Sequence, residues 1–267
     1  MRIIASLLAC IGSCAVLAAD SPAVLVTRGH AHNDYEHARP LLDALDKGFC
    51  SIEADIFLVD GQLLVGHSRS ALKPQRTLQA LYLDPLRQRV QANHGRVYPD
   101  GPTIILLIDV KTEAEPTYLS LREVLKNYAE MLTVFHEDRI EPKAISVIIS
   151  GERARKLMEA EKTRLAAYDG RLEDLDQPSS PSFVPLVSAS WPFHWRGDGP
   201  MPPEEQSKLR ELVNEAHTQK RQIRFWGGPD IRAFWEVQYQ CGVDWINTDN
   251  LRGLHEFMAA KAQSDKP

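Results

Sequence analysis

Short apolar runs alternate with amphipathic stretches along almost the whole chain, and this alternation is what most restricts its fold. Near-continuous apolar runs such as Ile104-Ile-Leu-Leu-Ile108 are typical of a parallel sheet that helices cover. The predicted strands span residues 23–27, 51–57, 103–110, 144–150, 165–168, 183–187, 222–226 and 243–247. The predicted helices span residues 39–47, 77–92, 117–135, 151–160, 203–219, 231–239 and 251–261.

Eight strands with intervening helices favour a closed (β/α)8 TIM barrel, and the 267 residues suit a fold that takes about 250. An open doubly wound sheet is the alternative, because the fourth to sixth units are irregular. A net charge of -5 gives no electrostatic reason to expect nucleic-acid binding. We expect a monomer.

The first residues have the pattern of a secretory signal peptide. Arg2 supplies the positive start, residues 3–17 the apolar stretch, and residues 16–20 a small-residue exit. We predict a signal peptide over residues 1–19 and one domain over 20–267, in a secreted or periplasmic protein. Cys10 and Cys14 each follow small residues, so a lipoprotein is the alternative. No later run is long enough to span a bilayer.

Cleavage of this signal would leave Cys50 and Cys241 as the cysteines of the mature chain. In an oxidising compartment they either form one disulfide or stay as two buried thiols.

Two acidic residues, Glu53 and Asp55, share one face of a predicted strand. Strand side chains alternate between faces, so these carboxylates lie about 7 Å apart along the strand. They repel each other unless a positive charge lies between them. A hard divalent cation, Mg²⁺ or Ca²⁺, supplies that charge through oxygen ligands. Histidines before and after this segment indicate acid/base chemistry on a substrate that the metal holds.

Other polar residues lie at the ends of the predicted strands, where a barrel gathers its functional groups. Asp109 ends the third strand, and with Glu53 and Asp55 it predicts a three-carboxylate metal site. Lys111 either neutralises Asp109 or contacts a phosphate, and Arg224 either binds an anion or pairs with a carboxylate. The other strand-end residues are His30, His32 and Asn33 on the first strand, Trp226 on the seventh, and Thr248 and Asp249 on the eighth.

Aromatic residues gather in the predicted loop 191–202. Trp191, Phe193 and Trp195 either form an apolar lip at the barrel mouth or pack against the body of the protein.

The order His32-Asn-Asp-Tyr35, Glu53-Ala-Asp55 and Gly66-His67 resembles the catalytic region of phosphatidylinositol-specific phospholipase C. Glycerophosphodiester phosphodiesterases and sphingomyelinase D-type phospholipases share this frame. They are similar also in Asp60-Gly61, in Asp109-Val-Lys111 and in the segment 242–249. The resemblance reaches from about residue 24 to 250 and is dense over 28–67.

The departures from these families concern the substrate and the first catalytic histidine. Glycerophosphodiester phosphodiesterases have Arg-Gly after that histidine and then Pro-Glu-Asn, and neither stands here. The sphingomyelinase D-type alignment makes His30 the catalytic residue, whereas the phospholipase C alignment, which we favour, makes it His32.

The resemblance implies a metal-dependent phosphoric diester hydrolase that acts on a glycerophosphodiester or a phospholipid headgroup, with transient contact to a membrane surface. In that family His32 (or His30) would be the general base and His67 the general acid. Glu53, Asp55 and Asp109 would hold one cation, with Asn33 as a fourth ligand. Lys111, Arg224 and Trp226 would contact the substrate.

Two other functions remain open at this stage. The pair His30-Ala-His32 resembles the metal pair of amidohydrolase and polymerase-histidinol-phosphatase barrels. Those sites need further histidines at later strand ends, and the fifth and sixth predicted strands end without one. The second alternative is a secreted barrel that binds phosphoinositides or sugars without turnover.

Overall fold

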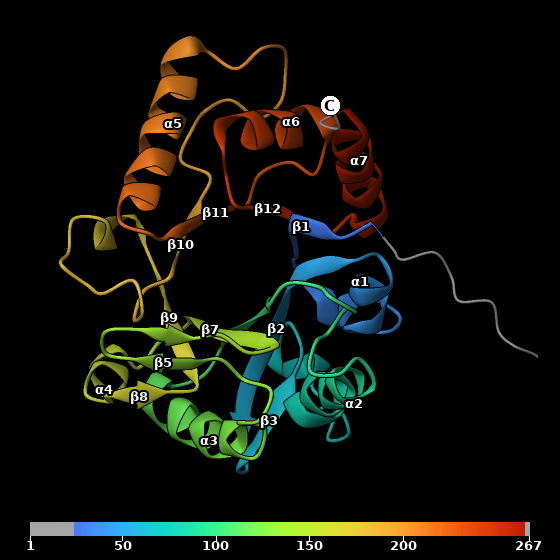
Figure 1. The fold of residues 1–267 in the computed structure, drawn as a ribbon, viewed down its shortest axis with the longest axis vertical. Helices are drawn as coiled ribbons and strands as arrows, with labels where there is room; N and C mark the ends of the chain where they lie inside the picture. Colours follow the sequence, from blue (N-terminus) through green and yellow to red (C-terminus); the bar gives the residue numbers. More distant parts are fainter. Residues whose placement is uncertain (1–23, 265–267) are drawn as a thin grey trace, which may run out of the picture.

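The computed structural model describes residues 24–264, and these fold into a closed barrel of eight parallel strands (Figure 1). The order around the barrel is β1-β2-β4-β7-β9-β10-β11-β12, and β12 pairs again with β1. The predicted TIM barrel is therefore confirmed. The strands are β1 Val26–Ala31, β2 Phe49–Val59, β4 Ile104–Val110, β7 Ile145–Gly151, β9 Ala166–Gly170, β10 Leu186–Ser190, β11 Gln222–Trp226 and β12 Trp245–Thr248.

The helices lie outside this barrel. Figure 1 shows α5, α6 and α7 beside β10 to β12 and β1, with α2 and α3 beside β2 and β3. The α-helices are α1 Leu42–Asp46, α2 Asp84–Ala92, α3 Ala114–Lys126, α4 Arg155–Glu159, α5 Pro203–Thr218, α6 Arg232–Cys241 and α7 Leu251–Ser264. Short helical turns are η1 Asp34–Glu36, η2 Arg69–Ala71, η3 Gln79–Leu83 and η4 Leu172–Asp174.

The strand register brings the polar strand ends together. Asp55 on β2 is paired with Asp109 on β4, and Asp109 is paired with Ser150 on β7. Glu53 lies two residues before Asp55, so its side chain points to the same inner face one layer deeper. The barrel mouth thus presents carboxylates from two adjacent strands.

The structure corrects several predicted boundaries. The first strand runs over Val26–Ala31 rather than 23–27, so His30 lies inside the strand. The third helix ends at Lys126, because a short sheet of strands β5 Val134–His136, β6 Ile140–Glu141 and β8 Thr163–Arg164 follows it. The prediction also missed β3 Gln62–Val65, which pairs antiparallel with the end of β2.

Two predictions about the chain ends and cysteines have different outcomes. The predicted signal peptide lies outside the described residues. Cys50 and Cys241 are both buried free thiols, so the disulfide alternative is wrong. Among the described residues, none of the helices combines the length and the apolar character that crossing a bilayer requires.

Candidate active site

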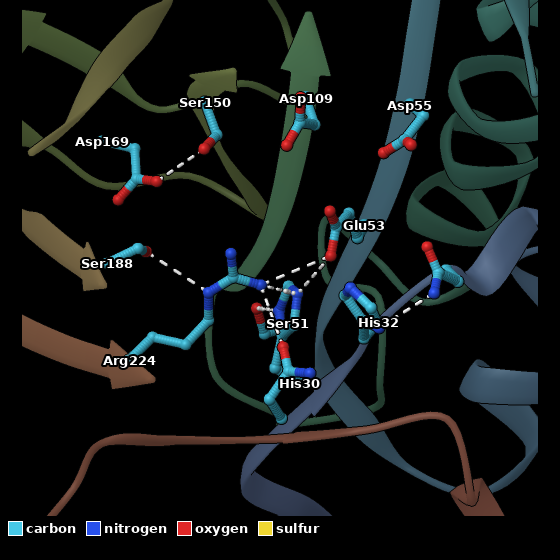
Figure 2. Close-up of polar contacts among 12 residues, drawn as sticks. His30, His32, Ser51, Glu53, Asp55, Asp109, Ser150, Asp169, Ser188 and Arg224 are labelled. Carbon is cyan, nitrogen blue, oxygen red and sulfur yellow. Dashed lines mark hydrogen bonds and ion pairs between the residues drawn. The ribbon is translucent and has the colours of Figure 1, made fainter. Parts of the chain in front are cut away.

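The carboxyl ends of the barrel strands direct polar side chains into one mouth (Figure 2). Three of these side chains, Glu53, Asp55 and Asp109, form the carboxylate cluster. Each offers an oxygen, and the three oxygens all lie within 4.8 Å of one another. In the described part of the chain, no other group of three His, Cys, Asp or Glu meets this condition. The amidohydrolase-type alternative, which needs a histidine cluster, therefore has no support here.

Lys111 lies against the carboxylate cluster. Its ammonium group is 3.1 Å from Oδ2 of Asp55 and 3.1 Å from Oδ1 of Asp109. Burial lowers the pKa of Lys111, but the charges of Asp109 and Asp55 outweigh burial and raise it. Of the two predicted roles for Lys111, the structure shows the neutralising one.

Arg224 pairs with Glu53, which leaves the one ammonium group of Lys111 for the two carboxylates of Asp55 and Asp109. Burial, followed by the charge of Glu53, raises the pKa of Asp55 to about 6. Burial also raises the pKa of Asp109. Because both pKa values are raised, the charged forms are disfavoured and this part of the cluster is short of positive charge.

The cluster fits a hard divalent cation. Oδ1 of Asp55 is buried and has no hydrogen-bond partner, so one ligand oxygen is free of protein contacts. The donor set consists of carboxylate oxygens, which Mg²⁺ and Ca²⁺ prefer. Gly151 (φ +68°) lies beside the Asp109 carboxylate, where any side chain would clash, because its Cβ would lie 2.2 Å from Oδ1 of Asp109. The absence of a side chain at this position leaves room around that carboxylate.

His30 and His32 point to the same side of β1 but lie at different depths. His30 is buried, with Nδ1 2.7 Å from Oγ of Ser51 and Nε2 2.5 Å from Nη1 of Arg224. Burial, then the Arg224 charge, lowers the pKa of His30 to about 4. Its ring is therefore neutral near pH 7. Nε2 also lies 3.0 Å from Oε2 of Glu53, so this one nitrogen contacts both Arg224 and Glu53.

His32 lies at the mouth and pairs with Asp249. Its Nδ1 donates to Oδ1 of Asp249 at 2.9 Å, which leaves Nε2 for the mouth. Burial lowers the pKa of His32, but the hydrogen bond to Asp249 and the charge of Glu53 outweigh it and raise the pKa. The two histidines thus differ chemically: His30 is buried and neutral, and His32 has an accessible basic nitrogen.

Tyr35 connects His67 to the carboxylate cluster. Its hydroxyl is 2.6 Å from Oδ2 of Asp55, 2.7 Å from Oδ1 of Asn33 and 3.1 Å from Nδ1 of His67. The rings of Tyr35 and His67 also stack, with centroids 6.4 Å apart. Since Oδ1 of Asn33 already lies against the Tyr35 hydroxyl, its predicted role as a fourth metal ligand would require sharing that oxygen.

Glu53 and Arg224 form the buried floor of the mouth. Nη1 of Arg224 is 3.3 Å from Oε2 of Glu53 and 3.1 Å from Oδ1 of Asn247, and Nε donates to Ser188 at 3.3 Å. Burial would raise the pKa of Glu53, but its hydrogen bond to His30 and the Arg224 charge hold that pKa well below its usual range. Of the two predicted roles of Arg224, the structure therefore shows the pairing with a carboxylate. The hydrogen bonds that Arg224 makes to the described residues use Nε and Nη1, and none of them uses Nη2.

The aromatic residues divide into rim and core. Trp226 is 41% exposed at the end of β11, as a substrate-lining residue requires. Trp191 and Trp195 are buried and pack against Phe234, with Trp191 also in contact with Phe193. The apolar-lip alternative is wrong for these two tryptophans, because the loop packs them against the barrel.

Sequence reasoning missed a second polar group in the mouth. Asp169 is fully buried on β9, and its Oδ2 accepts from Oγ of Ser150 at 2.7 Å (Figure 2). The same oxygen accepts from Nη1 of Arg171 at 2.9 Å. Asp169 ends an apolar strand as Asp109 does, which is the signal that could have identified it. Ser51, the partner of His30, gave no such signal.

Comparisons with known proteins agree with this architecture. The family model of the AIM6-like phosphodiesterase domain matches residues 21–169. The altered inheritance of mitochondria protein 6 homolog of Arthroderma benhamiae is 29% identical over 270 residues, covering 87% of this chain and 86% of the relative. The altered inheritance of mitochondria protein 6 of Eremothecium gossypii is 29% identical over 271 residues, with 87% and 70% covered.

A solved structure supports the fold independently. The crystal structure of a glycerophosphodiester phosphodiesterase from Parabacteroides distasonis is similar with a TM-score of 0.51 and 16% sequence identity, covering 90% of this chain and 97% of the other. The predicted resemblance to the phospholipase C-like phosphodiesterases is confirmed. With a family model that matches more than half of its residues, the chain belongs to the AIM6-like phosphodiesterase domain family.

Proposed function

We propose that this protein is a metal-dependent phosphoric diester hydrolase that cleaves a glycerophosphodiester or the headgroup of a phospholipid. The observation that carries the proposal is the carboxylate cluster with two histidines beside it, His32 paired with Asp249 and His67 joined to Asp55 through Tyr35. A divalent cation held by Glu53, Asp55 and Asp109 would neutralise negative charge that grows on the phosphate during cleavage.

His32 acts as the general base. Asp249 accepts the Nδ1 proton, so the lone pair of Nε2 is directed at the mouth and takes a proton from the attacking hydroxyl. The pKa of Asp249 is lowered by its hydrogen bond to His32, so Asp249 stays ionised and stabilises the imidazolium that forms.

His67 acts as the general acid. In its protonated form Nδ1 donates to the oxygen of Tyr35, whose own proton goes to Asp55. The remaining N–H of His67, which is 65% exposed as a side chain, is available to protonate the leaving alkoxide. Nη2 of Arg224 and the ammonium group of Lys111 offer the nearest positive charge to the phosphate oxygens.

The proposed localisation and the proposed contact with a membrane surface rest on the sequence alone. A signal peptide over residues 1–19 would place the enzyme in the periplasm or outside the cell, where it meets phospholipid surfaces or their soluble degradation products.

The test is an activity assay on the purified mature protein with Mg²⁺ or Ca²⁺. The substrates are glycerophosphodiesters, phosphatidylinositol, lysophospholipids and sphingomyelin. His32→Ala and His67→Ala should each lower kcat about 10²–10⁴-fold, the usual contribution of one acid/base group. The control is His194→Ala, which changes an exposed histidine in the loop after β10.

Chelation of divalent ions should abolish wild-type turnover. Full activity of His67→Ala, or turnover that neither chelation nor Glu53→Ala reduces, would refute the site assignment.

A further inference from the structure

Asp230 lies in the loop between β11 and α6 and joins that loop to the end of β12. Its Oδ1 accepts from Oγ1 of Thr248 at 2.6 Å and from Nε1 of Trp235 at 2.9 Å. Its Oδ2 accepts from the backbone N–H groups of Asp249 at 2.9 Å and Asn250 at 2.7 Å. Both oxygens are thus fully used within the protein, and three of the four donors belong to residues 248–250, the turn that carries Asp249.

Asp249 needs such support, because its own side chain is 61% exposed. An exposed side chain loses rotational freedom when it holds a partner in one geometry, and that cost reduces the net strength of the contact. Asp230 fixes the backbone from which this side chain projects. Thr248 adds to the same turn, because its Oγ1 also accepts the N–H of Asn250 at 2.9 Å.

The order of contacts is therefore Asp230 to the backbone of Asp249, and the carboxylate of Asp249 to Nδ1 of His32. A shift of the Asp249 backbone by a few tenths of an ångström would lengthen the hydrogen bond that selects the Nδ1–H form of His32. That form is the one with a free Nε2 at the mouth.

We propose that Asp230 is a positioning residue of this phosphodiesterase: it holds Asp249 where Asp249 can fix the tautomer of His32. The inference rests on the proposed function, in which His32 is the base. Asp230 itself does not touch the substrate.

The direct test reads the tautomer and not the activity. In ¹⁵N-histidine-labelled protein, the imidazole nitrogen shifts distinguish Nδ1–H from Nε2–H. The wild type should show His32 with Nδ1–H. Asp249→Asn and Asp230→Asn should both move it towards Nε2–H, because an amide cannot accept the two backbone N–H bonds as strongly as a carboxylate.

Asp244→Asn is the matched control. Asp244 also accepts a backbone N–H, from Ile223 at 2.9 Å, and a histidine nitrogen, Nε2 of His217 at 2.9 Å, but it lies at the other end of β12. It should disturb packing to a similar degree and leave the His32 spectrum unchanged. If Asp230→Asn does not fold, Thr248→Ala provides the second variant, since it removes one donor to Asp230 and should cause a smaller change in the same direction.

Kinetics supply the second readout. On the diester that the wild type cleaves fastest, Asp249→Asn should lower kcat/KM about 100-fold and Asp230→Asn about tenfold. When Asp230→Asn is combined with Asp249→Asn, kcat/KM should fall by less than about threefold beyond the loss in Asp249→Asn alone, since both substitutions act through one contact.

Fully additive losses, or a wild-type His32 spectrum in folded Asp230→Asn, would overturn the inference. If none of the diesters is cleaved, the proposed function fails, but the tautomer measurement still decides whether Asp230 positions His32.

Discussion

The two sides of the barrel mouth handle buried charge differently. The carboxylate side consists of Glu53, Asp55, Asp109 and Lys111. The arginine side consists of Asp169 and Asp174 with Arg155 and Arg171. On the arginine side each acid meets its own guanidinium group: Asp169 is 2.9 Å from Arg171, and Asp174 pairs with Arg155.

Asp174 on the arginine side and Asp55 on the carboxylate side have pKa shifts in opposite directions. Burial would raise the pKa of Asp174, but the backbone N–H of Arg171 and the charge of Arg155 lower it. The pKa of Asp55 is raised to about 6, because burial and Glu53 outweigh Lys111. Each acid of the arginine side thus has a guanidinium partner of its own, whereas Asp55 and Asp109 share Lys111 and store repulsion that a bound cation would relieve.

Glu53→Gln should have the largest effect, because Glu53 is a predicted metal ligand and also the carboxylate partner of Arg224. Removing one member of a buried ion pair typically costs about 3–5 kcal/mol, since the other charge stays buried. We expect the free energy of unfolding in urea to fall by about this amount, and Mg²⁺ binding in calorimetry to weaken. Glu152→Gln, an exposed change just after β7, is the control. An unchanged unfolding curve would mean that Arg224 does not depend on Glu53.

The next effect concerns pH and Asp34, a fully buried acid in the motif that precedes the carboxylate side. Burial raises its pKa to about 7, although the N–H of Leu41 and the hydroxyl of Tyr82 oppose the shift. The unfolded chain releases this proton near pH 4 and the folded protein near pH 7. Between these values the folded state binds more protons, so stability falls as the pH rises.

Urea unfolding of wild type and Asp34→Asn at pH 5 and pH 7 measures this contribution. Stability of the wild type should fall between the two pH values by about 2 kcal/mol more than that of the variant. His30, with a pKa of about 4, has the opposite sign: its contribution rises with pH between about 4 and 6.5. It is present in both proteins and cancels in the difference. An equal pH dependence in both would show that Asp34 titrates normally.

Asp169→Asn on the arginine side and Asp109→Asn on the carboxylate side make the same chemical change on the two sides of the mouth. Asp169→Asn leaves Arg171 without its carboxylate and should cost about 2 kcal/mol of stability. Its effect on Mg²⁺ affinity should be within twofold. Asp109→Asn should do the reverse, with weaker Mg²⁺ binding and little loss of stability, since it relieves repulsion. If both variants lose metal affinity equally, the two sides are not independent.

How much of this site the sequence predicts depends on how local each part is. Glu53 and Asp55 lie on one strand and His67 follows soon after, so their spacing alone indicates that they share a mouth. Period-two alternation, however, places His30 and His32 on the same face and says nothing of depth. Their different roles follow from Ser51, Arg224 and Asp249, which come from β2, β11 and the end of β12.

The fold was predictable for a related reason. Eight apolar strands with helices between them leave few alternatives, and each predicted strand overlaps an observed one. The missed elements β5, β6 and β8 are two or three residues long and depend on tertiary packing rather than on a repeating pattern. The arginine side was missed because its charges are paired across loops: Asp174 meets Arg155, which stands in another strand–helix unit.

Lys111→Met gives the smallest effect, and its direction is specific to the carboxylate side. The ammonium group of Lys111 is bound to Asp55 and Asp109, two of the three carboxylates that a cation would use. A cation must therefore compete with Lys111 for those carboxylates. Removing the ammonium group should raise Mg²⁺ affinity about tenfold, or 1.4 kcal/mol, when measured by calorimetry on metal-stripped protein.

Without metal the same variant should be less stable than the wild type, because the repulsion between Asp55 and Asp109 loses its internal counter-charge. Lys73→Met, which changes an exposed lysine, should alter neither quantity. Weaker metal binding in Lys111→Met would mean that Lys111 assembles the carboxylates for the cation instead of competing with it. In the proposed hydrolase, a cation on the cluster would free the ammonium group, and the same competition would make Lys111 available to the substrate phosphate.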